Sequence, residues 1–82
     1  MNKLIELEII SSDKSEKFPV YWVEVESPTG NFVVGFGHEN LISIIEPRSK
    51  LKYKDQEKFI QEIDIYDGII EVSNNRATVL IE

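Results

Sequence analysis

Hydrophobic and polar residues alternate along several short stretches of this chain. In residues 4–10, LIELEII, apolar residues alternate with Glu6 and Glu8, and residues 21–26, YWVEVE, repeat the pattern with Glu24 and Glu26. Successive side chains of a strand point to opposite faces, so a period of two is typical of strands with one buried face. The side chains predicted to point inward are Ile5, Leu7, Ile9, Tyr21, Val23 and Val25.

Two further alternating runs lie near the end of the chain. They are GIIEV, residues 68–72, and ATVLIE, residues 77–82, and the turn-forming letters SNN precede the second run. Two strands separated by such a signal predict a β-hairpin. Its predicted inward side chains are Ile70, Val72, Ala77, Val79 and Ile81.

One segment, residues 54–68, has two interpretations. Phe59, Ile63 and Tyr66 have helical spacing, and Gly68 is suited to ending a helix. The stretch FIQEIDI within it also alternates, with Ile63 and Ile65 set against acids, and its isoleucines favour a strand. Periodicity favours the strand and leaves the helix open.

Short polar clusters separate the apolar runs. The clusters SSDKSEK (residues 11–17), SPTGN (27–31) and EPRSK (46–50) are predicted as connections, and none has the length of an interdomain linker. The pattern predicts one domain over residues 1–82, with roughly seven to nine strands in an antiparallel sandwich or barrel.

Composition narrows the classes of function. The 82 residues include nine basic and fifteen acidic side chains, a formal charge of −6, which disfavours nucleic acids and anionic lipids as partners. There is no cysteine, so disulfides and thiolate-zinc sites are excluded. Glu6 and Glu8 interrupt the first apolar run, which argues against a signal peptide, and no apolar stretch approaches the ~20 residues that span a bilayer.

Residues 30–40, GNFVVGFGHEN, hold three of the four glycines and the only histidine. No nucleophile motif accompanies His38, and a metal site lacks further imidazoles, so His38 is predicted to bond a neighbouring backbone group in a loop. The glycines form no nucleotide-binding fingerprint, and Gly30, Gly35 and Gly37 are predicted at turns, bulges or close backbone contacts. No cofactor is predicted.

A few apolar residues occur at positions where alternation predicts an exposed side chain. Grouped on one sheet, such residues form a patch that marks a protein interface, whereas singly they carry no meaning. They are Trp22, Ile60, Ile69 and Leu80.

The order of these motifs resembles the N-terminal domain of the epsilon subunit of F-type ATP synthases, called delta in mitochondria. That family carries a glycine–histidine loop, here GNFVVGFGHENL, and a closing hairpin, here DGIIEVSNNRATVL. The hairpin matches at Gly68, Glu71, Val72, Asn75, Thr78, Val79 and Leu80. The loop matches at Gly30, Phe32, Gly37, His38 and Leu41.

The resemblance implies an all-β fold: a small antiparallel β-sandwich of two packed sheets with roughly eight to ten short strands. It implies a non-catalytic rotor subunit that links the gamma subunit to the membrane c-ring and couples ion translocation to ATP synthesis. The implied location is peripheral, on the cytoplasmic face of the bacterial inner membrane. The implied ring-docking residues are Gly30, Asn31, Phe32, Gly37 and His38, and the candidate gamma interface is Trp22, Ile60, Ile69 and Leu80.

Several positions depart from the family pattern. Asn31 replaces an acid, so a charged ring contact is expected to be lost, and Phe36 and Asn40 replace prolines, which is expected to loosen the loop. The family's C-terminal helices are missing after residue 82, so a short form without nucleotide binding is expected. These departures motivate the alternative of a free-standing adaptor, while an enzyme and an oligonucleotide-binding barrel are less favoured.

Overall fold

The computed structural model describes residues 3–82, and every regular element in that range is a β-strand. The strands are β1 (Ile5–Ile10), β2 (Ser15–Ser27), β3 (Gly30–Gly35), β4 (Leu41–Ile45), β5 (Ser49–Asp55), β6 (Ile60–Ile65), β7 (Gly68–Ser73) and β8 (Arg76–Ile81). Among these residues no helix is long and apolar enough to cross a membrane.

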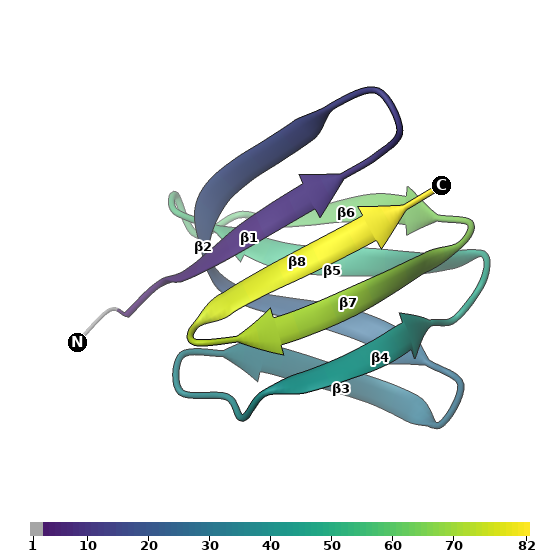
Figure 1. Cartoon of the computed structure of the whole chain (residues 1–82). Helices are drawn as coiled ribbons and strands as arrows, with labels where there is room; N and C mark the ends of the chain where they lie inside the picture. The colour runs from purple at the N-terminus through teal and green to yellow at the C-terminus, as the bar shows by residue number, and fades with distance from the viewer. Residues whose placement is uncertain (1–2) are drawn as a thin grey trace.

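The eight strands form one curled sheet that folds over into two layers. The strand order is β4-β7-β8-β1-β2-β5-β6, and β3 also pairs with β2. In Figure 1 the strands β1, β8, β7 and β4 form the front layer, while β6, β5 and β3 lie behind them. This architecture is the predicted β-sandwich.

The sheet is mixed, which corrects one detail of the prediction. All pairings but one are antiparallel, whereas β1 and β8 run parallel, with Leu7 opposite Ala77 and Ile9 opposite Val79. A parallel pair cannot be joined by a tight turn, and here the whole chain between the two strands forms the connection. The alternation of apolar and polar residues within a strand does not indicate whether its neighbour runs parallel or antiparallel.

Strand β2 is long and belongs to both layers. Its first part pairs with β1 and its second part with β3 and β5, with an irregularity between Val20 and Trp22. Such a bulge lets a strand bend and changes the phase of its side chains. Tyr21, predicted to point inward, is therefore only half-buried, while Val20 is fully buried.

All three predicted connections are in part strands. Residues 15–17 of SSDKSEK pair with β1, SPTGN contributes residue 27 to β2 and residues 30–31 to β3, and residues 49–50 of EPRSK begin β5. Most of these side chains are polar and face solvent, and backbone pairing holds the residues in the sheet. The ambiguous segment FIQEIDI contains strand β6, as the alternation and the family resemblance indicated.

The core consists of the inward side chains of both layers. Fourteen residues are buried hydrophobics: Ile5, Leu7, Ile9, Val20, Val23, Val25, Val34, Ile45, Leu51, Ile65, Ile70, Val72, Ala77 and Val79. Apart from Tyr21 and the half-buried Ile81, the predicted inward positions of the first and last strand pairs are all among them.

Gly68, at the start of β7, lies where two backbones approach closely. A Cβ atom on it would lie 2.9 Å from the carbonyl oxygen of Leu80 and 3.3 Å from the side chains of Ile65 and Ile81. Real Cβ atoms are not found at the first distance, so glycine is required here by space.

Candidate functional site

The predicted ring-docking residues lie at the two ends of β3. Gly30 and Asn31 lie at the turn that joins β2 to β3, while Gly37 and His38 follow the other end of the strand. Six strand residues separate the two ends by roughly 20 Å. Phe32 lies between them and packs against the core. The five residues therefore do not form one surface, and their docking role stays a prediction.

The turn between β2 and β3 is polar and exposed. Its conformation is held locally, because Ser27 Oγ donates to the carbonyl oxygen of Gly30 at 2.6 Å and the Thr29 N–H donates to Ser27 Oγ at 3.3 Å. Gly30 has a φ of +132°, a backbone conformation that side chains disfavour. The turn thus presents Pro28, Thr29 and Asn31 to solvent on a defined backbone.

The loop at the other end, residues 36–40, is tied to the turn between β7 and β8. The Gly37 N–H donates to Asn75 Oδ1 at 2.7 Å, and the Asn74 N–H donates to Asn40 Oδ1 at 3.3 Å. Asn40 stands where the family has a proline. Two side-chain hydrogen bonds therefore constrain this loop where the resemblance predicted loosening.

The β7–β8 turn itself is the predicted hairpin turn. Only Asn74 and Asn75 separate the strands, and their φ angles are +52° and +61°. Positive φ at both central residues defines a type I′ turn, which asparagine tolerates better than most residues. Asn75 thus combines a strained backbone conformation with a bond to the neighbouring loop.

We expect substitutions of Asn75 to separate these two roles. Asn75→Gly keeps the backbone conformation and loses the bond to Gly37, so the free energy of unfolding should fall by about 1 kcal/mol. Asn75→Ala also loses this bond and places alanine in a left-handed backbone conformation, so the free energy of unfolding should fall by about 2 kcal/mol. Urea denaturation of both variants measures the difference, and equal losses would show that the backbone conformation carries no cost.

His38 has the role predicted for it as a loop residue. Its Nδ1 donates to the carbonyl oxygen of Glu39 at 2.8 Å, and its ring lies 6.5 Å from that of Phe32 between centroids. Its hydrogen bond is thus to a neighbouring backbone group, and the described contacts bring no nucleophile to it. Gly30 and Gly37 have the predicted positive φ, whereas Gly35 has neither positive φ nor a close contact.

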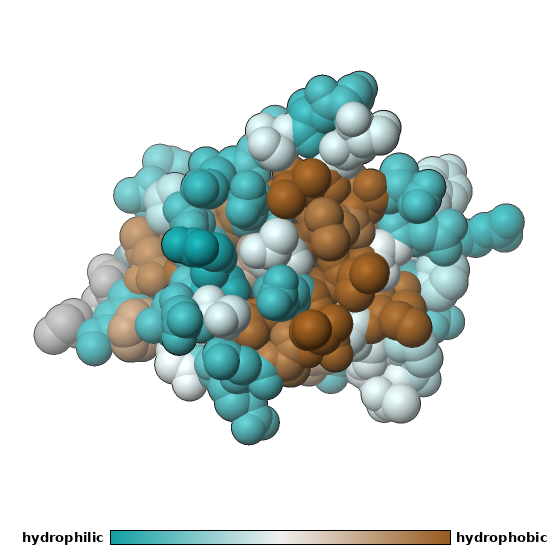
Figure 2. Space-filling view, viewed as in Figure 1, coloured by the Kyte–Doolittle hydropathy of each residue, from teal (hydrophilic) through white to brown (hydrophobic). Residues whose placement is uncertain are grey.

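The outer face of the front layer carries a row of apolar side chains across four strands. Ile44 lies opposite Ile69, Ile69 opposite Leu80, and Leu80 opposite Ile10, so these four residues form what we call the apolar row. Ile42 lies two positions from Ile44 on the same face. Figure 2 shows this face with apolar residues gathered at its centre and right and hydrophilic residues at its left.

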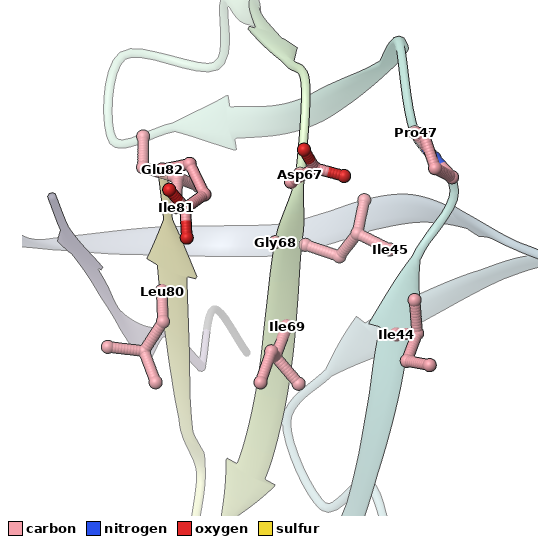
Figure 3. A pocket seen from close by; sticks show the side chains of 9 residues that line it. All are labelled: Ile44, Ile45, Pro47, Asp67, Gly68, Ile69, Leu80, Ile81 and Glu82. Carbon is pink, nitrogen blue, oxygen red and sulfur yellow. The ribbon is translucent and has the colours of Figure 1, made fainter.

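The apolar row borders a shallow groove of about 350 Å³. In Figure 3 the side chains of Ile44, Ile69 and Leu80 come from three neighbouring strands, and the carboxylates of Asp67 and Glu82 lie toward the other end. No basic residue lines the groove. The face therefore combines exposed apolar surface with negative charge, which suits a partner that is apolar and basic.

The candidate gamma-interface residues divide between the two layers. Ile69 and Leu80 belong to the apolar row, with 43% and 46% of their surface exposed. Trp22 and Ile60 lie on the back layer, both opposite Lys54 of β5. That face is charged, since Lys50 and Lys52 on β5 face acids of β2 and β6. The four residues do not form one patch, and their role in gamma binding stays a prediction.

The shifted pKa values occur on β5, away from the apolar row. The pKa of Asp55 is lowered, chiefly because the Gln61 side chain donates to it, and that of Lys50 is raised by its hydrogen bond to Asp64. Burial raises the pKa of Tyr53. Surface contacts and partial burial explain these shifts, and within residues 3–82 no three His, Cys, Asp or Glu side chains gather as metal ligands would.

Ile10, Ile42 and Ile44 were not predicted as surface residues. Ile42 and Ile44 are 72% and 63% exposed, the first of these more than any other large hydrophobic residue described. They occur in LISII, a nearly continuous apolar run, which is typical of a buried strand. The alternation within it, with Leu41, Ser43 and Ile45 on the opposite side, was the available signal.

Residues 4–82 match the family model described as the β-sandwich domain of the ATP synthase delta/epsilon chain. A search of curated proteins found no match.

Two solved structures have a similar fold. A chain in the Euglena gracilis mitochondrial ATP synthase structure (OSCP/F1/c-ring, rotational state 1) is 18% identical with a TM-score of 0.88, over 95% of this chain and 50% of that chain. A chain in the Tetrahymena thermophila mitochondrial ATP synthase structure (central stalk/c-ring) is 11% identical with a TM-score of 0.78, over 98% and 64%.

The chain thus spans between half and two thirds of the length of these two structural relatives. At such low identity the likeness shows the fold, and the family model, which covers nearly all of the chain, shows the lineage. The chain belongs to the family of ATP synthase delta/epsilon chain β-sandwich domains.

Proposed function

We propose that this protein is a non-catalytic central-stalk subunit of an F-type ATP synthase, which links the gamma subunit to the c-ring. The family match over residues 4–82 carries this proposal. It is supported by the two structural relatives, which come from ATP synthase structures that contain the c-ring. The protein would help couple ion translocation to ATP synthesis without taking part in bond chemistry.

The geometry suits a mechanical link. A two-layer sandwich with a continuous core resists shear, because moving one layer over the other would separate packed side chains. The apolar row and the exposed β2–β3 turn offer two separate places for attachment. A rigid body with two attachment surfaces can transmit torque between two partners.

We assign the gamma contact to the apolar row, and Ile69 and Leu80 are its proposed central residues. Exposed apolar surface of this kind is typical of the centre of a protein interface. Trp22 and Ile60 are less suited to the role, because the lysines and acids of the back layer surround them. In the complex the protein would be peripheral, on the cytoplasmic face of the inner membrane if the source is a bacterium.

We assign the ring contact to the β2–β3 turn, with Asn31 at its centre. Residues 28–31 are exposed, whereas His38 is half-buried, with its ring near that of Phe32, and its loop is tied to Asn75. The polar loops of a ring suit an exposed polar turn. Gly37 and His38, at the other end of β3, remain the second candidate for the ring contact.

Restoring the family's acid tests the assignment. Asn31→Asp is expected to tighten the association with the c-ring severalfold at low salt, because an added surface charge pair contributes up to about 1 kcal/mol, and the gain should vanish in high salt. The measurement is binding of the complex of this chain and gamma to purified c-ring. His38→Ala, at the other end of β3, should change the affinity less than twofold.

Three outcomes would contradict the assignments. A loss of ring binding in His38→Ala but not in Asn31 variants would move the contact to the other end. Stable binding to gamma with no binding to the ring would favour the free-standing adaptor. Failure of the wild-type chain to bind gamma would contradict the rotor role altogether.

A further inference from the structure

We propose that the free edge of β4 binds an extended segment of a partner protein by strand addition. The partner segment would carry apolar residues at alternate positions and basic residues beside them. The proposal deepens the gamma contact and rests on the proposed function for the identity of that partner.

Strand β4 is paired on one side only. It is the last strand of the sheet order and pairs with β7, and no other strand of the described chain forms a ladder with it. Just beyond its end, the Glu46 N–H donates to the carbonyl oxygen of Glu26 in β2 at 2.7 Å, so the edge open to a partner is that of residues 41–44. An unpaired strand edge presents a row of backbone N–H and C=O groups to which another strand can bind.

The hairpin geometry identifies these groups. In a hairpin with a two-residue turn, the residues that flank the turn, here Ser73 and Arg76, exchange backbone hydrogen bonds. Every second residue of β7 therefore bonds to β8, and the backbone groups of the residues between them point to β4. Ile70, opposite Ser43, faces β4. The backbone groups of Ser43 therefore bond to β7, and those of Ile42 and Ile44 point to the free edge. The carbonyl oxygen of Ile44 accepts a hydrogen bond from Ser43 Oγ at 3.0 Å, and its second lone pair is available to an added strand.

This edge lacks the features that usually prevent strand addition. The sequence of β4, LISII, contains no charge, proline or glycine. Edge strand β6, in contrast, carries Glu62 and Asp64, and β3 begins and ends with glycine. Charged residues on an edge are the common protection against a further strand.

The side chains beside the free edge fit an apolar neighbour. Ile42 and Ile44 are exposed on the outer face, and an added strand would place its own outward side chains next to them. The new strand would thereby extend the apolar row by one member. The addition buries side chains and satisfies backbone groups at the same time.

The charges around β4 indicate which charge the partner segment should carry. Glu39 and Glu46 flank the strand at its two ends and are exposed, and Glu71 lies opposite Ile42. Asp67 and Glu82 line the neighbouring groove. An apolar segment flanked by lysine or arginine complements this setting, and an acidic segment is repelled.

A pair of substitutions at Ile42 tests the strand addition. Ile42→Pro and Ile42→Ala both remove the large side chain, and only proline also removes the outward N–H. That N–H has no partner in the β4–β7 ladder, and proline is tolerated on edge strands in this orientation, so both variants should fold. Affinity for the gamma subunit, measured by calorimetric titration, should be about tenfold weaker for Ile42→Pro than for Ile42→Ala.

The outcomes of these binding experiments distinguish a wrong strand addition from a wrong rotor role. If wild type binds gamma and the two variants bind equally, the edge does not take part and the strand addition is wrong, while the rotor role stands. If wild type does not bind gamma, the rotor role itself fails. If sedimentation shows a wild-type dimer that Ile42→Pro dissociates, a second copy of this chain occupies the edge, and the proposal of a foreign strand is overturned. Thermal unfolding of each variant confirms that it is folded.

Discussion

Replacing both Ile69 and Leu80 by aspartate is expected to weaken binding to the gamma subunit by at least about a hundredfold. The two residues are neighbours in the apolar row and lie across from each other on β7 and β8. In a complex, each aspartate would place a charge where apolar surface is desolvated, and replacing a hot-spot residue at the centre of an interface costs about 2 kcal/mol or more. In the free protein both side chains contact solvent, so the fold should persist.

A matched control lies on the other layer. Ile60→Asp introduces one such aspartate on a strand residue that is 60% exposed and lies opposite Lys54. It should change gamma affinity less than about threefold. Surface plasmon resonance with immobilised gamma measures both effects. If Ile60→Asp weakens binding as much as the double substitution, the back layer forms the interface, and the assignment to the apolar row is wrong.

Gly68→Ala is expected to lower the free energy of unfolding by about 2 kcal/mol, with a melting temperature lower by roughly 10 °C. The added methyl group would meet the carbonyl oxygen of Leu80 at 2.9 Å, which is a backbone atom in the adjacent strand and cannot rotate away. Relief requires β7 and β8 to separate locally, at the point where the groove lies between them. The substitution should therefore weaken partner binding as well as stability.

Gly35→Ala provides the comparison for this effect. The methyl group there would meet only the carbonyl oxygen of Tyr21, at 3.8 Å, and the backbone φ is not positive. Its free energy of unfolding should change by less than about 0.5 kcal/mol. Calorimetric melting of both variants compares the two glycines, and a small effect at Gly68 would show that the strands adjust freely.

The sequence predicted the strands whose two faces differ in polarity. Glu6 and Glu8, set between buried isoleucine and leucine, identify β1 because one of its faces is solvated. Strand β5 was harder to predict, because its lysines at 50, 52 and 54 resemble a polar connection. The acids opposite Lys50 and Lys52 on the neighbouring strands become apparent only from the strand pairing. The first part of β2 was missed for a related reason: exposed strand residues carry no apolar signal.

The apolar row could not be predicted, because it depends on pairings between distant strands. The position of Leu80 in the alternation already predicts an exposed side chain. That Ile10 and Ile69 lie beside it follows from the parallel pairing of β8 with β1 and from the register of the β7–β8 hairpin. The separation of Gly30 from Gly37 has a similar origin. Nearby in sequence, they lie at opposite ends of β3 because the residues between them are extended.

The parallel pairing of β1 with β8 also determines when the protein can fold during its synthesis. Strand β1 is made first, but its neighbour in the front layer is the last strand of the described chain, about seventy positions later. Until β8 leaves the ribosome, one side of β1 has no strand partner and Leu7 and Ile9 lack the neighbours opposite them. Contacts of such long sequence separation slow folding, and we expect folding in milliseconds to seconds, with the sheet completed only once β8 has been made.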